Sequence, residues 1–228
     1  RGGSGGRSSG GDRCGEARVT RFVLASGNAH KLGEFRQILA PHEVQGMPGD
    51  IELPPEGIDS FAENAREKAL ALWRALRARG GEAGADGVWC LADDSGLQVE
   101  ALGWAPGVTS ARYAGVDGPG ADTANVARLL REMAGCAGPL ARRARFVCSL
   151  CAVAPDGSEH AVEGHWWGAI AEAPSGAGGF GYDPVFVPDG SDSTVAEWPA
   201  AEKDRASHRA LAGQQLLELL RHEGVLRI

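Results

Sequence analysis

Apolar residues recur along this chain with two periods, and the two periods predict a mixture of strands and helices. The apolar run from Arg21 to Ala25 predicts a buried strand, and apolar side chains at positions 32, 35, 38 and 39 predict a helix directly after it. The sequence SFAE at positions 60–63 is a capping-box pattern, and it predicts a helix that stops at Gly80. The next apolar run, Val88 to Ala92, predicts a second buried strand with Asp93 following its carboxyl end.

The second half of the chain predicts antiparallel strands. Leu97 to Ala101 alternates as a strand does, and it is followed by the polar, glycine-rich loop GWAPGVTSARYAG. A short helix is predicted from Asp122 to Glu132, and a last helix from near Ser207 to Gly224. Three further strands with short connections are predicted at 145–154, 158–163 and 165–171, and another strand after Asp183 and Pro184. The pattern therefore predicts an α/β fold with a mixed sheet.

Composition limits the classes of protein that this chain could belong to. Its 228 residues suffice for one sizeable core, which we expect to span residues 19–228 as a single domain. The first 18 residues are rich in Gly, Ser and Arg, and we expect them to be a flexible tail. A formal charge of −7 argues against non-specific binding to nucleic acid or to anionic membranes. No apolar run approaches the roughly 18 residues of a membrane span, so a soluble protein is expected.

The cysteines predict a reducing environment. The chain has five of them, an odd number, and only Cys148 and Cys151 are close in sequence. That pair lies in a predicted strand, where positions three apart point to opposite faces, so a shared metal is not expected. Reduced, mostly buried thiols in a cytoplasmic protein are the expectation.

The lysines are the first candidates for binding an anionic substrate. The chain has 23 basic side chains, and only Lys31, Lys68 and Lys203 are lysines. An ammonium group is a compact point charge that fits among several phosphate oxygens, whereas a guanidinium is a planar fork. Ser26 and Asn28 precede Lys31 at a predicted helix start, where backbone N–H groups can also face phosphate. Plain helix capping and solvent-exposed lysines are the alternative reading.

Adjacent carboxylates predict a metal site. Asp93 and Asp94 would repel each other unless a cation or hydrogen-bond donors compensate them. Mg²⁺ suits such a site because it binds a few oxygen ligands and takes the rest from phosphates. Glu56, on a turn shaped by Pro and Gly, is a third carboxylate that could reach a cation. Asp, Ser and Gly are also good turn formers, so a structural turn at 93–96 is the alternative.

Two segments near the C-terminus offer groups for recognising a planar ligand. Phe180 lies in the glycine-rich segment GAGGFGYDPVF, where its ring could stack on a base or pack in the core. No glycine-rich turn opens a helix there, so the segment is not a dinucleotide fingerprint. His208 and Arg209 begin the last predicted helix, where the helix dipole disfavours positive charge. A ligand at this point would explain them, and plain solvent exposure is the alternative.

Taken together, the segments SGNAHKLGEF, FAENAREKA, ADDSGLQVEALGWAPGVTSARYAG, GGFGYDPVF and AEKDRASHRAL resemble the inosine triphosphate pyrophosphatase family, also called the RdgB/HAM1 family. The resemblance covers about residues 21–222. It implies an elongated mixed sheet with flanking helices, divided into two lobes around a central cleft. It also implies a homodimeric, magnesium-dependent hydrolase that converts ITP, dITP and XTP to the monophosphate and pyrophosphate, clearing deaminated purines from nucleotide pools.

The resemblance also implies roles for individual residues. Asp94 matches the catalytic residue with Asp93 beside it, and Glu56 and Asp94 match metal-associated carboxylates. The implied triphosphate-binding residues are Ser26, Asn28, Lys31 and Lys68. The implied base-binding residues are Ser95, Phe180, Tyr182, Asp183, Lys203, Ser207, His208 and Arg209. The chain departs from the family pattern at Ser26, where threonine is frequent, and at Trp104, where glycine is frequent. It departs again at Trp167 and Trp198, whose positions are not usually aromatic.

Two other functions stay open at this point. A nucleotide-binding sensor without turnover would keep Phe180 and the lysines, but it would not need Glu56, Asp93 and Asp94 together. A hydrolase of ordinary or pyrimidine nucleoside triphosphates would keep all of them. The sequence does not separate the base role of Asp94 from metal ligation, and it does not reveal how GTP is excluded.

Overall fold

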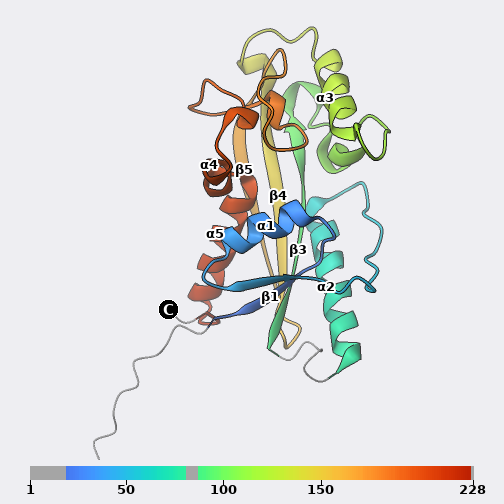
Figure 1. Ribbon diagram of the computed structural model, residues 1–228, viewed down its shortest axis with the longest axis vertical. Helices are drawn as coiled ribbons and strands as arrows, with labels where there is room; N and C mark the ends of the chain where they lie inside the picture. Colours follow the sequence, from blue (N-terminus) through green and yellow to red (C-terminus); the bar gives the residue numbers. More distant parts are fainter. Residues whose placement is uncertain (1–18, 81–86, 227–228) are drawn as a thin grey trace, which may run out of the picture.

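A computed structural model describes residues 19–80 and 87–226, and these form one mixed sheet flanked by helices (Figure 1). The sheet has six strands in the order β2-β1-β3-β4-β5-β6. Strand β1 pairs in parallel with β2 and β3, whereas β3, β4, β5 and β6 pair antiparallel. The strands are β1 (Arg21–Leu24), β2 (Glu43–Gly46), β3 (Val88–Val99), β4 (Arg143–Val153), β5 (Glu159–Ile170) and β6 (Phe186–Pro188). The predicted α/β class and mixed sheet are therefore confirmed.

Helices cover both faces of this sheet. In Figure 1, α5 lies along one side of the long strands and α2 along the other, while α3 lies beside their far end. The α-helices of the described residues are α1 (Ala29–Ile38), α2 (Phe61–Arg79), α3 (Ala121–Glu132), α4 (Ala200–Ala206) and α5 (His208–His222). Short 3₁₀ helices join them: η2 (Glu100–Leu102), η3 (Gly107–Arg112), η4 (Leu140–Arg142), η5 (Asp183–Val185) and η6 (Val195–Glu197). None of the helices in the described ranges is long and apolar enough to cross a bilayer.

Side-chain caps fix where three of the helices begin. Asn28 accepts hydrogen bonds from the backbone N–H groups of His30 and Lys31 at the start of α1. Ser60 accepts from the N–H of Glu63 at the start of α2, and Ser207 caps α5 in the same way. Each cap supplies an acceptor to backbone donors that the first helical turn leaves without a partner. These three predicted helix starts are confirmed, and the helix predicted from Asp122 to Glu132 is α3, whereas α4 and β2 were not predicted.

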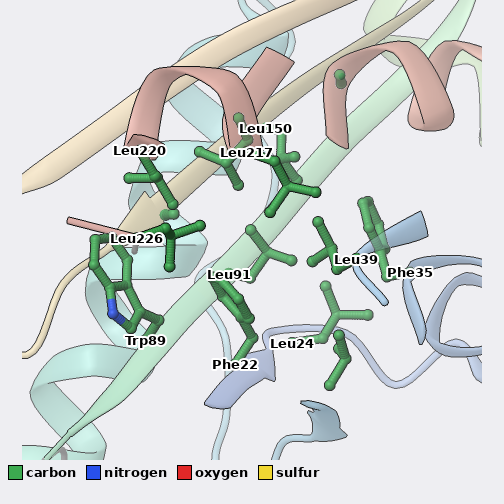
Figure 2. Packing of buried hydrophobic residues seen from close by; sticks show 14 of the residues in the cluster. Phe22, Leu24, Phe35, Leu39, Trp89, Leu91, Leu150, Leu217, Leu220 and Leu226 are labelled. Atoms are coloured by element: carbon green, nitrogen blue, oxygen red, sulfur yellow. The ribbon is translucent and has the colours of Figure 1, made fainter. Parts of the chain in front are cut away.

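Three apolar clusters hold the helices on the sheet. Figure 2 shows the first, in which Phe22, Leu24 and Leu91 of the sheet pack against Phe35 of α1 and Leu217 of α5. On the other face, a second cluster joins α2 to β3 and β4 through Leu72, Cys90 and Cys151. A third lies at the far end of the sheet, around Phe146 and Phe186. Cys148 and Cys151 belong to different clusters, which confirms that they point to opposite faces.

Two predicted strand breaks are wrong, because both segments run through as single strands. Strand β3 continues from Val88 to Val99, so Asp93 and Asp94 lie in its middle and not after its end. Strand β5 continues through Gly164, which we had placed between two strands. This glycine lies where α5 crosses the sheet, and a β-carbon there would meet the His208 carbonyl oxygen and would lie 2.6 Å from the Ala212 nitrogen. It permits close packing and does not interrupt the strand.

Trp104 occupies a backbone conformation that favours glycine. Its φ is +72°, and among the described residues it is the only residue other than glycine with a positive φ. A bulky side chain in the left-handed region costs backbone energy. The ring compensates in part by packing edge-on to Trp167 at 6.3 Å, with the Arg145 guanidinium 4.8 Å from its centre.

The packing at Gly164 yields a stability prediction. Gly164→Ala should lower the free energy of unfolding by about 3 kcal/mol, because the new methyl group meets the α5 backbone, which cannot rotate away. Urea denaturation followed by circular dichroism measures this difference. Gly33→Ala, in α1 with open space around it, is the control and should stabilise by about 0.5–1 kcal/mol. Equal stabilities for parent and Gly164→Ala would mean that α5 does not sit this close to β5.

Candidate functional site

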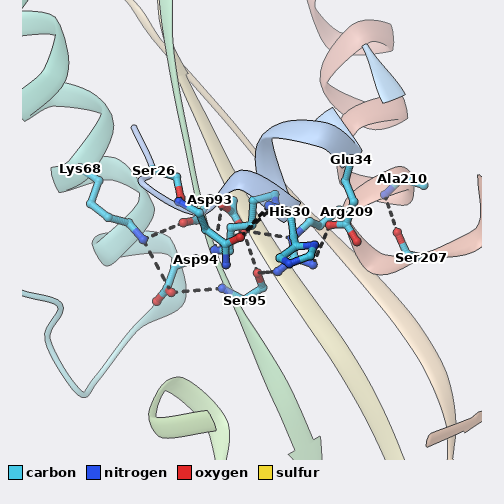
Figure 3. Close-up of polar contacts among 12 residues, drawn as sticks. Ser26, His30, Glu34, Lys68, Asp93, Asp94, Ser95, Ser207, Arg209 and Ala210 are labelled. Carbon is cyan, nitrogen blue, oxygen red and sulfur yellow. Dashed lines mark hydrogen bonds and ion pairs between the residues drawn. The ribbon is translucent and has the colours of Figure 1, made fainter. Parts of the chain in front are cut away.

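The centre of the candidate site is Asp93, whose carboxylate is completely buried between three elements (Figure 3). The Lys31 ammonium of α1 donates to both of its oxygens, at 2.8 and 3.0 Å. Arg209 of α5 donates from Nε at 3.3 Å, and Ser95 Oγ donates at 2.8 Å. Burial alone would raise the pKa of Asp93, but attraction to Lys31 and Arg209 holds it well below its usual range. Asp93 is therefore a permanently ionised anchor for two cations.

Asp94 points to the other face of β3, because successive side chains of a strand alternate. Asn64 of α2 donates to its Oδ2 at 2.8 Å, and the Lys68 ammonium lies 3.8 Å from its Oδ1. The same ammonium donates to Glu56 Oε1 at 2.7 Å and to the Asp93 carbonyl at 2.7 Å. Burial raises the pKa of Asp94, although Lys68 and Asn64 oppose this. Glu56, which is partly exposed, and Asp94, which is buried, thus share the cation of Lys68.

Arg209 connects Asp93 to a second buried carboxylate, Glu34 of α1. Its Nη1 donates to Glu34 Oε2 at 3.0 Å, and its Nη2 donates to Ser95 Oγ at 3.0 Å. Lys203 of α4 lies 3.7 Å from the other oxygen of Glu34. The positive charge at the start of α5, which the helix dipole disfavours, is thus compensated by carboxylates of the protein itself. The alternative of plain solvent exposure is wrong, because Arg209 is buried, and carboxylates of the protein compensate its charge without a ligand.

Phe180 lies beside this network on the loop between β5 and η5. Its backbone N–H donates to Asp183 Oδ2 at 3.0 Å, and the Lys203 ammonium donates to the same oxygen at 2.6 Å. That ammonium also lies 4.2 Å from the centre of the Phe180 ring, in cation–π contact. Gly179 has a φ of +70° and no room for a side chain, because Asp183 turns back over it. The ring is therefore held in one orientation by its neighbours.

A cavity of about 470 Å³ opens between α1, the Phe180 loop and α4. Phe180, His30, Glu34 and Lys203 line it together. Its walls thus combine an aromatic face with a carboxylate and an ammonium, which is the mixture that orients a planar polar ligand.

Four further residues were predicted to belong to the site: Ser26, Asn28, Tyr182 and Ser207. Ser26, which is partly buried, and Asn28, which is exposed, lie at the start of α1 beside Lys31. Ser26 Oγ accepts a hydrogen bond from the Asn28 N–H at 3.2 Å. Tyr182 is buried, and its hydroxyl donates to the Ser110 carbonyl at 2.9 Å. Ser207 is buried and its hydroxyl caps α5. The polar atoms of Tyr182 and Ser207 are thus used within the protein.

His208 is also buried, and its ring stacks on Phe146 at 4.8 Å. Burial, together with the charges of Arg209 and Lys203, holds the pKa of His208 well below its usual value, so the ring is neutral. Its Nδ1 has no hydrogen-bond partner among the described residues. A buried ring nitrogen without a partner is costly in a folded protein.

Sequence reasoning missed two members of this site, Glu34 and Asn64. Glu34 lies one turn after Lys31 in α1, and a charged residue at that spacing reads as solvent-exposed. Asn64 lies one turn before Lys68 in α2, and its contact with Asp94 joins residues 30 positions apart. The only sequence signal was that each lies on the same helix face as a candidate lysine.

The fit of a metal can be judged from the donors at Glu56 and Asp94. Both offer hard carboxylate oxygens, and both already face one positive charge on Lys68. Mg²⁺ is commonly held by one or two carboxylates together with substrate phosphates and water. The residues therefore fit Mg²⁺. Within residues 19–80 and 87–226, no group of three or more His, Cys, Asp or Glu side chains is arranged to hold a metal.

The fold and the site define a class of protein: an α/β protein with a mixed sheet whose central strand places paired carboxylates among lysines and beside an aromatic pocket. The sequence matches the family model described as the Ham1 family over residues 22–219. The chain belongs to the Ham1 family, which confirms the resemblance found in the sequence.

Relatives and solved structures agree with this membership. The chain is 46% identical to the dITP/XTP pyrophosphatase of Nocardia farcinica over 210 residues, which cover 89% of this chain and 95% of that protein. It is also 46% identical to the dITP/XTP pyrophosphatase of Ralstonia nicotianae, covering 89% of this chain and 98% of that protein. The Ham1 protein of Staphylococcus aureus superposes with a TM-score of 0.75 at 35% identity, covering 90% of this chain and 100% of that one.

The buried ion pairs around Asp93 yield a prediction about stability. Asp93→Asn should lower the free energy of unfolding by about 3 kcal/mol at pH 7, because it leaves the buried Arg209 and the partly buried Lys31 without this carboxylate. The folded pKa of Asp93 is depressed, so its contribution is present above the unfolded pKa of about 3.9 and is lost as pH falls below it. The difference between parent and variant should therefore narrow below about pH 4. Urea denaturation between pH 7 and pH 3 measures both quantities.

Asp50→Asn is the matched control, because Asp50 forms an exposed pair with Arg79 at 2.8 Å. Solvent screens such a pair, so its loss should hardly change the stability at pH 7. An Asp93→Asn protein as stable as the Asp50→Asn protein at pH 7 would contradict the anchoring role of Asp93.

Proposed function

We propose that this protein hydrolyses deaminated purine nucleoside triphosphates, namely dITP, ITP and XTP, to the nucleoside monophosphate and pyrophosphate. One observation carries the proposal: β3 places Asp93 and Asp94 on opposite faces, each next to a lysine, beside a cavity with an aromatic wall. Relatives that are 42–46% identical to this chain are named dITP/XTP pyrophosphatases, which supports the same substrate class here. Clearing such nucleotides from the nucleotide pools would be the consequence.

The triphosphate would bind where α1 begins and where Lys68 faces Glu56. Lys31 lies at the first turn of α1 and is only partly buried, so its ammonium can turn from Asp93 to a phosphate oxygen. Ser26 and Asn28 stand beside it as further hydrogen-bonding groups. Lys68 would stabilise negative charge that develops during the reaction on the departing pyrophosphate.

Asp94 is the residue that we assign to the attacking water. Its pKa is raised, and it lies near Lys68 and the partly exposed Glu56. Both features suit a carboxylate that orients a water or accepts its proton. We give this task to Asp94 and not to Asp93, because the Asp93 oxygens accept hydrogen bonds from Lys31, Arg209 and Ser95. Glu56 and Asp94 would hold Mg²⁺, which when bound would stabilise charge on the phosphate oxygens.

The base would lie in the cavity beside Phe180, with Lys203 and Glu34 on its walls. Hypoxanthine and xanthine present an acceptor at O6 and a donor at N1, which match an ammonium and a carboxylate respectively. Adenine reverses both, since it presents a donor at N6 and an acceptor at N1. A buried site built around such hydrogen bonds can reject the mismatched base by about 10⁴-fold. Arg209 joins the same network through its ion pair with Glu34 at 3.0 Å.

A substrate panel tests the function. Purified protein with saturating Mg²⁺ is given dITP, ITP, XTP, GTP, ATP and UTP, and pyrophosphate and orthophosphate are measured separately. The expected result is pyrophosphate release with kcat/KM for dITP, ITP and XTP about 10⁴-fold above that for ATP. Activity should vanish when EDTA removes the metal. Orthophosphate as the product would indicate attack at the γ-phosphorus, and nucleotide binding without product would indicate a sensor; either outcome contradicts the proposal.

The control for this panel is Asp94→Asn. It removes the charge assigned to water and metal but keeps the shape of the side chain, so it should fold normally and lose at least about 100-fold in kcat. Hydrolysis of ITP within a few-fold of the parent, at saturating Mg²⁺, would mean that the activity does not depend on Asp94.

We also propose a homodimer in the cytoplasm. The exposed apolar side chains of Ile58 and Trp104, which line one cavity of about 440 Å³, support a surface that a second copy covers. Cys90, Cys136, Cys148 and Cys151 are free thiols in the described part of the chain, which suits a reducing compartment. Sedimentation equilibrium should give twice the chain mass of 23.7 kDa. Trp104→Glu should shift the protein toward the monomer, and a parent that is monomeric at micromolar concentration would contradict the proposal.

A further inference from the structure

His30 and Phe180 face each other across the cavity beside α1. Their rings are nearly parallel, with an angle of 28° between the planes and 6.0 Å between the centres. His30 lies in the first turn of α1, whereas Phe180 lies 150 positions later on the loop before η5, so only the tertiary fold brings them together. Both side chains line the cavity that also contains Glu34 and Lys203.

The His30 ring is not used to hold the protein together. Its residue is exposed, and neither ring nitrogen makes a hydrogen bond within the described part of the chain. The backbone N–H of His30 is fixed by Asn28 at 2.9 Å, so the first turn of α1 carries the ring at a defined place. An exposed aromatic ring at a cavity mouth, without a polar partner, is free to contact a ligand.

The spacing of the two rings suits a planar insert. Aromatic planes in van der Waals contact lie about 3.5 Å apart, so a base between two walls needs about 7 Å. The ring centres are 6.0 Å apart and the planes are tilted by 28°, so the exposed His30 side chain must swing outward to admit a base between the rings. Phe180 cannot move as easily, because its loop is tied to Asp183 and its ring contacts Lys203.

We propose that His30 is the second wall of a stacking slot, so that the purine of the substrate lies between the imidazole and the Phe180 ring. The proposal rests on the proposed function, since it places the base of that substrate. Stacking contacts the face of a base and does not read its edge. His30 would therefore strengthen binding of every purine nucleotide alike and favour the bicyclic purine over a pyrimidine, whereas Lys203 and Glu34 would distinguish one purine from another.

Steady-state kinetics of His30→Ala and His30→Phe test the slot. His30→Ala should raise KM for ITP about 10-fold, with kcat within about two-fold of the parent, because it removes one stacking wall and no reacting group. The ratio of kcat/KM for ITP to that for ATP should not change, and the ratio for ITP to UTP should fall. His30→Phe should restore KM for ITP to within about two-fold of the parent, because any aromatic ring can stack. His222→Ala, an exposed histidine in the last turn of α5, is the control and should leave KM unchanged.

Binding of IMP, measured by calorimetry, separates the slot from the activity. A parent that binds IMP about 10-fold more tightly than His30→Ala supports the slot even if no triphosphate is hydrolysed, in which case the proposed function alone fails. Unchanged or tighter IMP binding by His30→Ala would overturn the slot. The imidazole would then contribute nothing to binding, or it would compete with the base for the Phe180 ring. A His30→Phe variant as weak as His30→Ala would overturn it too, since the role would then not be stacking.

Discussion

The structure depends on one buried carboxylate, Asp93, and on the requirement that its charge be compensated. An ionised carboxylate without partners is far too costly inside a protein, so the ammonium of Lys31 and the guanidinium of Arg209 must reach it. Lys31 lies in the first turn of α1 and Arg209 in the first turn of α5. Their ion pairs with Asp93 therefore hold the first turns of both helices against the sheet. The same contacts set the place of Glu34, which lies on α1 and pairs with Arg209. The fold and the candidate site are therefore held by one set of ion pairs.

Strand geometry divides the two adjacent carboxylates between two tasks. Because neighbouring side chains in a strand point to opposite faces, Asp93 is enclosed by α1 and α5 while Asp94 faces α2 and Glu56. Their pKa values move in opposite directions for this reason, downward for the residue among cations and upward for the one that burial dominates. Two chemically identical side chains thus acquire opposite pKa shifts through the direction in which each one points.

Aromatic and charged groups meet in the pocket next to this strand. Phe180 is fixed by the loop contacts of Asp183 and by Lys203, and His30 approaches from α1. The pocket therefore has one rigid wall and one wall that is free to adjust. A rigid wall orients a ligand, and an adjustable wall can close on it at small energetic cost because the exposed ring breaks no hydrogen bond. Under the proposed function, this pocket holds the base of the nucleotide.

Local patterns in the sequence determined the α/β class, the starts of α1, α2 and α5, and the segments that carry Lys31, Lys68, Asp94 and Phe180. These features depend on residues a few positions apart, where caps and apolar periods act directly. The sequence did not reveal that β3 and β5 run without a break, because a glycine or an acidic pair inside a strand resembles a turn until its neighbours are known. It also did not reveal Glu34, the pairing of Asp93 with Arg209 or the approach of His30 to Phe180. Those contacts join residues up to 175 positions apart, and only the packing of helices on the sheet decides which distant charges and rings meet.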